Sequence, residues 1–88
     1  MFYVYILKSE RNGRFYNGYT ADLKRRLREH NTGQSFATRP YVPWGLAFYA
    51  AFKTEEKAKS FEAYLKTGSG WAFARKRFIS PSGSQRRP

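Results

Sequence analysis

Two short runs of apolar and aromatic residues open the chain, with turn-forming residues between them. Every residue of Phe2–Leu7 is aromatic or aliphatic, which is typical of a strand buried on both faces. Phe15–Thr20 has the composition of a second strand, and Asn12 and Gly13 lie between the two runs. Because Asn-Gly favours a two-residue type I′ turn, the pattern predicts an antiparallel hairpin.

A two-residue turn at this point also predicts a register for the hairpin. It sets Tyr5 opposite Thr20 and Leu7 opposite Gly18. Since side chains alternate along a strand, one sheet face would then carry Tyr3, Tyr5, Leu7, Tyr16, Gly18 and Thr20. A slip of one residue would separate the tyrosines of the two strands onto opposite faces.

Helical spacing follows the second strand. Leu23 and Leu27 are four residues apart and form an apolar stripe. Thr20 is the expected N-cap, with Asp22 in the first turn at the positive end of the helix dipole. Asn31–Gly33 is expected to end this helix.

The second half of the chain predicts one more strand and two more helices. Gln34–Gly45 is a long irregular segment, and segments of this length are often functional. Leu46–Lys53 is the expected third strand, and Thr54 is the expected cap of a second helix. The buried stripe of that helix is expected to be Ala58, Phe61 and Leu65. Gly68–Gly70 is expected to end it, before a short final helix over residues 71–78. The order β-β-α-β-α-α predicts an α/β fold of the α+β type.

Length and composition exclude several classes of protein. A chain of 88 residues supports one core, and the absence of cysteine excludes disulfide scaffolds and thiolate metal sites. No apolar run approaches the roughly 20 residues that span a bilayer, and the opening run makes a poor signal peptide. The net charge of +11 points to a polyanion, most simply nucleic acid. We therefore expect a soluble, cytoplasmic protein that binds nucleic acid and no membrane.

The charge is unevenly distributed. Residues 75–88 hold five of the 17 basic side chains and no acid, and the rest of the chain is still basic. Ser80–Pro88 has no apolar residue, so we expect residues 1–79 to form one domain and residues 80–88 a basic disordered tail. The composition favours a solubilising role for this tail, and a loose phosphate clamp is the alternative.

Five residues are candidates for chemistry, although each has a plain structural explanation. Glu62 lies beside the second helix's apolar stripe, where an i, i+4 ion pair with Lys66 would account for it. A partly buried carboxylate in a basic protein is alternatively a ligand for a divalent cation. The only histidine, His30, would favour the dipole at its helix end. The remaining candidates are Arg26, Tyr5 and Tyr16, and the combination carries more weight than any member.

The order and spacing of these residues resemble a known family. Tyr3–Tyr5, Tyr16–Gly18 and the run Thr-x-Asp-Leu-x-x-Arg-x-x-x-His-Asn-x-Gly over 20–33 are similar to the GIY-YIG nuclease domain. Residues 58–73 resemble its small single-domain bacterial members, which are related to the N-terminal nuclease domain of the excision-repair endonuclease. The resemblance covers residues 2–78 and implies a three-stranded antiparallel sheet flanked by helices.

The resemblance also implies a reaction and a role for each candidate. The reaction is hydrolysis of phosphodiester bonds in DNA by an endonuclease that uses one Mg²⁺ or Mn²⁺ ion. Tyr5 matches the base for the attacking water, and Tyr16 matches the tyrosine that orients water or phosphate. Arg26 matches the contact to the scissile phosphate, Glu62 matches the metal ligand, and His30 matches a position that assists proton transfer. A phenol with its ordinary pKa of about 10 is a poor base, so nearby positive charge is needed to favour the phenolate.

The sequence departs from the family pattern at three positions. Tyr3 replaces the first glycine, Asn17 replaces an aliphatic residue or threonine, and Tyr19 stands where excision-repair relatives carry lysine. The expected phosphate contacts are Lys24, Arg25, Arg28, Arg39 and Lys66, in a monomer that binds DNA in preference to RNA. The alternative is a non-catalytic nucleic-acid-binding protein with the same fold.

Overall fold

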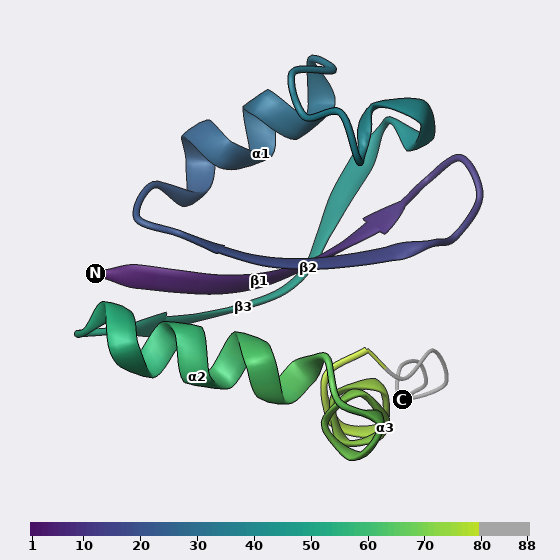
Figure 1. The fold of residues 1–88 in the computed structure, drawn as a ribbon. Coiled ribbons are helices and arrows are strands. Elements are labelled where there is room, and N and C mark those ends of the chain that lie inside the picture. Colours follow the sequence, from purple (N-terminus) through teal and green to yellow (C-terminus); the bar gives the residue numbers. More distant parts are fainter. Residues whose placement is uncertain (80–88) are drawn as a thin grey trace, which may run out of the picture.

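The computed structural model describes residues 1–79 and has the predicted element order. Figure 1 shows its elements: β1 (Phe2–Ser9), β2 (Phe15–Thr20), α1 (Leu23–Asn31), the 3₁₀ turn η1 (Arg39–Tyr41), β3 (Trp44–Phe52), α2 (Glu55–Leu65) and α3 (Gly68–Arg77). The predicted tail, Ser80–Pro88, lies outside the described residues.

The three strands form one antiparallel sheet in the order β2-β1-β3. Because β1 is central and both of its faces are covered, Val4–Leu7 is fully buried, as its composition predicts. A bulge in the β1–β3 pairing lies between Ile6 and Leu7. β2 and β3 are the edge strands, so the candidate Tyr5 on β1 lies in the middle of the sheet.

The predicted hairpin register is wrong by two residues. Tyr5 pairs with Gly18 and Leu7 with Tyr16, because the connection is longer than a two-residue turn. The Ser9 hydroxyl accepts hydrogen bonds from the backbone N–H groups of Arg11 and Asn12 and so holds a wider loop. An even shift preserves side-chain direction, so the predicted sharing of one face by the two tyrosine sets is confirmed.

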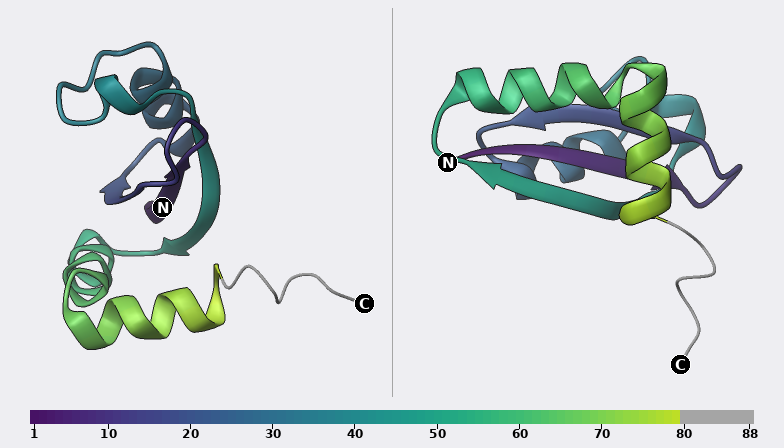
Figure 2. Two further views of the ribbon diagram at one scale, coloured as in Figure 1. Left: turned by 90° about the vertical axis from the view of Figure 1, so that its right-hand side faces the viewer. Right: turned by 90° about the horizontal axis from the view of Figure 1, so that it is seen from below.

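The two faces of the sheet have different cores. α2 and α3 cover one face, where the fully buried residues are Val4, Ile6, Ala58, Leu65 and Ala74. Phe48 of β3 stacks on Phe78 after α3, with ring centroids 4.1 Å apart. α1 covers the other face, where Leu23 and Leu27 pack against Tyr5, Leu7 and Trp44. Figures 1 and 2 show α1 on one side of the sheet and α2 with α3 on the other.

Helix α1 begins two residues later than predicted. Its N-cap is Asp22, whose carboxylate accepts a hydrogen bond from the Arg25 N–H, and not Thr20. The Thr20 hydroxyl instead accepts from the Asp22 N–H, so it supports the cap from outside the helix. The predicted stop is confirmed: the helix ends at Asn31, and Gly33 adopts a positive φ of 81°.

The two C-terminal helices are joined more tightly than predicted. Thr54 caps α2 as expected, by accepting from the Lys57 N–H. Gly68–Gly70, predicted to end a helix, forms the first turn of α3, because Thr67 caps that helix through the Gly70 N–H. A Cβ atom at Gly70 would overlap the Tyr64 carbonyl, so glycine lets α3 start against the end of α2.

The long segment between α1 and β3 is fixed to its neighbours. β3 begins at Trp44 and ends at Phe52, where the sequence predicts Leu46 and Lys53. Asn31 donates its amide to the Trp44 carbonyl at 2.9 Å and accepts from the Trp44 N–H at 2.6 Å. These two bonds join the end of α1 to the start of β3 and so hold residues 34–43 against the α1 face.

Candidate active site

Tyr5 is held in place by the strand beside it. Its side chain is 2% exposed and lies across Gly18, its partner on β2. A Cβ atom at Gly18 would come within 2.5 Å of the Tyr5 hydroxyl. Glycine is therefore required at position 18 so that the phenol can cross the edge strand.

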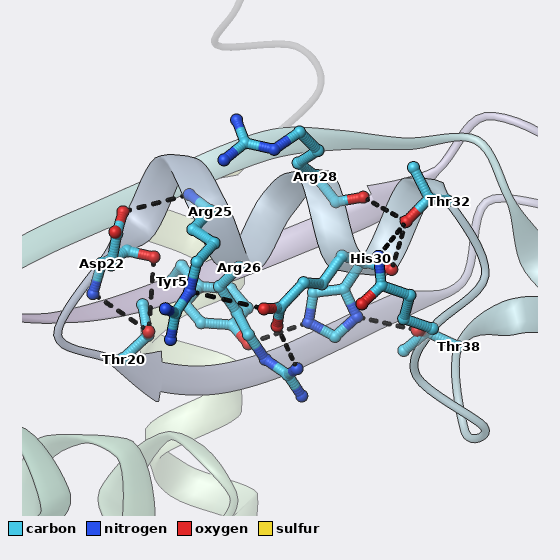
Figure 3. Close-up of polar contacts among 11 residues, drawn as sticks. Tyr5, Thr20, Asp22, Arg25, Arg26, Arg28, His30, Thr32 and Thr38 are labelled. Atoms are coloured by element: carbon cyan, nitrogen blue, oxygen red, sulfur yellow. Dashed lines mark hydrogen bonds and ion pairs between the residues drawn. The ribbon is translucent and has the colours of Figure 1, made fainter.

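The hydroxyl of Tyr5 is the end of a buried polar chain. It lies 3.0 Å from Nε2 of His30, and Nδ1 of the same ring lies 2.7 Å from the Thr38 hydroxyl. All three residues are at most 2% exposed. Tyr16 packs edge-on against the His30 ring, with centroids 5.2 Å apart. The structure thus brings Tyr5, Tyr16 and His30 together, and Figure 3 shows the contacts of Tyr5, His30 and Thr38.

Burial sets the charge state of this chain. It lowers the pKa of His30 to about 4, an effect that the positive charge of Arg26 adds to and Glu29 opposes. His30 is therefore neutral at pH 7. Burial also raises the pKa of the Tyr5 phenol, whereas the nearby Arg26 guanidinium acts in the opposite direction. Tyr5 consequently needs additional positive charge before it acts as a base at neutral pH.

Arg26 lies at the solvent side of this cluster. Its side chain is 34% exposed and donates from Nη1 to Glu29 at 2.9 Å. The bond to Glu29 raises the Arg26 pKa, so the guanidinium carries its charge at every relevant pH. Its charge opposes the rise in the Tyr5 pKa. A partly exposed guanidinium beside a buried phenol is suited to contact a phosphate.

Glu62 belongs to a different layer of the molecule. It lies on α2, across the sheet from α1, and its carboxylate accepts from the Lys66 ammonium at 2.9 Å. The ion pair that explains Glu62 structurally is therefore present. The side chain is 18% exposed, and its negative charge contributes to the raised pKa of Tyr5, which places it within electrostatic range of the phenol.

The donor set near Glu62 fits a hard cation that keeps most of its water. Residues 1–79 contain no group of three or more His, Asp or Glu side chains that could hold a metal ion. Mg²⁺ is commonly held by one or two carboxylates, with water and substrate phosphate completing its coordination. Glu62 supplies one such carboxylate if Lys66 releases it.

The predicted phosphate contacts are divided between two parts of the fold. Lys24, Arg25 and Arg28 lie on α1, Arg39 begins η1, and Lys66 caps α2. Arg25 pairs with Glu29 at 3.4 Å, and Arg39 lies over the Phe36 ring. Arg28 is about 200° around the helix from Arg26, and Figure 3 shows it projecting away from the tyrosine side. The structure therefore does not gather these five residues on one surface.

Thr38 and Asn31 are site residues that sequence reasoning missed. Thr38 lies in the long segment predicted to be functional, but no periodicity distinguishes its hydroxyl from others nearby. Asn31 is predicted as part of the helix stop and of the family-like run over 20–33, but with no role at the site. Asn17, a departure from the family pattern, has a buried Oδ1 without a hydrogen-bond partner in residues 1–79, and no structural reason for this is evident.

Comparisons with known proteins identify the family of the chain. A family model described as the GIY-YIG catalytic domain matches residues 1–71. A UPF0213 protein of Streptococcus pneumoniae is 43% identical over 65 residues, which are 73% of this chain and 65% of the relative. One from Streptococcus agalactiae is 42% identical over 73% of each chain. The solution structure of a Bacillus halodurans UPF0213 protein superposes with a TM-score of 0.56 at 29% identity and covers 97% of this chain and 95% of that one.

The chain belongs to the GIY-YIG family, within the UPF0213 group of small bacterial proteins. The expected fold, a three-stranded antiparallel sheet flanked by helices, is confirmed. The chain spans just under two thirds of the S. pneumoniae relative, so the activity of that whole protein is not transferred from the match. No helix within residues 1–79 has the length and apolarity needed to cross a membrane.

Proposed function

We propose that this protein is an endonuclease that hydrolyses phosphodiester bonds in DNA with one divalent cation. The observation that carries the proposal is the buried contact between Tyr5 and His30, 3.0 Å apart, with Arg26 beside them. Burying polar groups is costly unless they are hydrogen-bonded, and apolar side chains alone would pack this face. The buried polar chain therefore calls for an explanation beyond packing. Such a chain beside the partly exposed guanidinium of Arg26 is suited to proton transfer next to a phosphate.

The residues act in a defined order in this proposal. Arg26 binds the non-bridging oxygens of the phosphate and, by its charge, lowers the barrier to ionising Tyr5. Tyr5 first loses its own proton to solvent. The phenolate then takes a proton from water, the water oxygen bonds to phosphorus, and the P–O bond to the departing sugar breaks. The departing oxygen takes a proton from solvent. Tyr16 packs against His30 and limits water around it.

Glu62, on α2, would hold the cation. When bound, the cation supplies positive charge that stabilises the phosphate and the departing oxygen. Glu62 must first exchange Lys66 for this ligand, which leaves the lysine available to a neighbouring phosphate. Branched or nicked DNA, as in repair, is the proposed substrate, and the proposed compartment is the cytoplasm.

The test is cleavage of branched, nicked and single-stranded DNA with Mg²⁺ or Mn²⁺. Tyr5→Phe is expected to lower kcat/KM by about 100-fold or more, because it removes the base and keeps the ring. Tyr49→Phe is the matched control, since Tyr49 pairs with Tyr5 across β1 and β3 and is 53% exposed.

Glu62→Gln is expected to abolish the dependence of cleavage on the metal concentration. Glu56→Gln, in the first turn of the same helix, should leave it unchanged. Equal cleavage by wild type, Tyr5→Phe and Glu62→Gln, or cleavage by none of them, would contradict the proposal.

A second candidate is a non-catalytic nucleic-acid-binding protein. The ion pair between Glu62 and Lys66 favours it, because it occupies the carboxylate that catalysis needs. This alternative predicts binding whose affinity is the same with Mg²⁺ or with a chelator and whose substrate remains intact.

A further inference from the structure

Thr38 lies where it can control which nitrogen of His30 carries the proton. Its side chain is 1% exposed, and its hydroxyl lies 2.7 Å from Nδ1. The opposite nitrogen, Nε2, is the one that meets Tyr5. A neutral imidazole has one N–H, so the direction of one hydrogen bond fixes the direction of the other.

The backbone of Thr38 is firmly held. Its carbonyl accepts from the Trp44 indole N–H at 2.9 Å and from the Tyr41 N–H at 3.1 Å, and its N–H donates to the Ser35 carbonyl. Thr38 is the N-cap residue of η1, yet its hydroxyl makes no capping hydrogen bond. A threonine at this position ordinarily turns its hydroxyl to the backbone, whereas here it turns to the imidazole.

Hydrogen-bond accounting favours one direction. In residues 1–79, Nδ1 of His30 is the only hydrogen-bond partner of the Thr38 hydroxyl. If the hydroxyl accepted from Nδ1, its own hydrogen would be buried without an acceptor among these residues. If it donates, Nε2 carries the proton and donates to the Tyr5 oxygen. While Tyr5 is a phenol, this direction leaves the Tyr5 hydrogen without an acceptor in the described part of the chain, at the end that borders the partly exposed Arg26, in place of the Thr38 hydrogen at the other end. When Tyr5 is a phenolate, only this direction pairs every buried donor of the polar chain.

We propose that Thr38 is a positioning residue that fixes His30 in the tautomer protonated at Nε2, so that the imidazole donates to the Tyr5 oxygen and stabilises its phenolate. The proposal rests on the proposed nuclease function for its catalytic consequence, but the tautomer itself is independent of activity. Charged or titratable groups around the ring come from three elements: Arg26 and Glu29 on α1, Tyr16 on β2 and Tyr5 on β1. Glu62 on α2 acts on Tyr5 through its charge.

The sequence makes the tautomer directly measurable. His30 is the only histidine, so long-range ¹H–¹⁵N correlation spectra of the full-length protein at pH 7 contain one imidazole. The low pKa of His30 keeps that ring neutral at this pH. Wild type is expected to show Nε2 protonated and Nδ1 unprotonated. The opposite assignment overturns the proposal without any variant.

Variants then connect the tautomer to cleavage. Thr38→Val keeps the shape and removes the donor, so the Nε2–H form should lose its dominance and kcat should fall about tenfold or more, with KM within twofold. Thr38→Ser keeps the hydroxyl and should restore both. Thr32→Val is the matched control, because the Thr32 hydroxyl donates to backbone carbonyls at the end of α1 and does not touch the ring.

The outcomes separate this proposal from the proposed function. An unchanged tautomer and unchanged kcat in Thr38→Val overturn the positioning role. If wild type cleaves no DNA yet shows the Nε2–H form, and Thr38→Val loses it, the nuclease function fails and the control of the tautomer stands. If Thr38→Val does not fold, the wild-type and Thr38→Ser spectra still decide the direction of the bond.

Discussion

Residue by residue, the α1 face of the sheet differs from an ordinary core because it buries hydrogen-bonding groups in a connected chain. Tyr5, His30 and Thr38 are as buried as the aliphatic residues on the opposite face. Gly18 permits this by leaving the space that the Tyr5 ring occupies. The glycine of the Tyr16–Gly18 motif is therefore explained by its close contact with Tyr5.

The buried imidazole predicts how stability depends on pH. His30 has a pKa of about 4 in the folded chain and an ordinary value near 6.5 when unfolded. The unfolded chain therefore binds more protons in this interval, and stability falls as the pH drops from about 6.5 to about 4. The free energy of unfolding is expected to fall by about 2 kcal/mol between pH 7 and pH 5, measured by urea denaturation.

His30→Gln is the control for this dependence, because glutamine does not titrate. Its unfolding free energy should be lower than that of wild type at pH 7 and nearly constant from pH 7 to pH 5. Parallel curves for the two proteins, or an NMR titration of His30 with a midpoint near 6.5, would contradict the assignment.

At the scale of elements, periodicity predicted the strands and helices, and side chains in the connections decided the details. The hairpin register depended on the Ser9 hydroxyl, and the start of α1 on the Asp22 carboxylate. Both residues make local hydrogen bonds that compete with the turn and cap signals at Asn12 and Thr20. The stop at Gly33 and the cap at Thr54 had no such competitor, and both were predicted correctly.

The candidate site, like the fold, was predictable where a repeating pattern sets the direction of the side chains. Tyr5, Tyr16 and His30 could be brought together from the sequence because strand alternation and helix spacing determine their directions. The position of Thr38 could not, because a segment without a repeating pattern gives no rule for side-chain direction. Its placement depends on Asn31, which joins α1 to β3 through two backbone contacts.

The two hydrogen bonds of Asn31 therefore predict that the end of α1 and the start of β3 depend on each other for stability. Asn31→Ala removes both bonds to Trp44 and is expected to lower the free energy of unfolding by about 1–3 kcal/mol. Hydrogen exchange should become faster at the end of α1 and in residues 34–43, with β1 unaffected. Gln34→Ala is the control, because the Gln34 amide donates only to the Thr32 hydroxyl at the surface. Uniform loss of protection across the sheet would instead show global destabilisation.

For the molecule as a whole, the two faces of the sheet are covered by different kinds of side chain. The face under α2 and α3 holds the apolar core, and the face under α1 holds the polar chain. The predicted phosphate contacts are distributed around both faces, so no single surface gathers the charge of residues 1–79, which hold 15 basic and six acidic side chains and so a net charge of +9. Binding of nucleic acid should accordingly depend on many weak contacts that each add to its salt dependence.

Removal of Ser80–Pro88 tests how much of that binding belongs to the C-terminal residues. The segment carries Arg86 and Arg87 and no acid. If both contact phosphates, a chain ending at Ile79 should show a plot of log K against log salt that is less steep by up to about 2, measured by fluorescence anisotropy with duplex DNA. Arg86→Gln with Arg87→Gln in the full chain should give the same decrease, and Ser82→Ala with Ser84→Ala should give none. An unchanged slope would favour the solubilising role.

The same deletion also tests whether these residues contribute to stability. Because the segment has no apolar residue, the melting temperature of the shortened chain should stay within about 2 °C of the full-length value. A larger decrease would show that these residues pack on the domain.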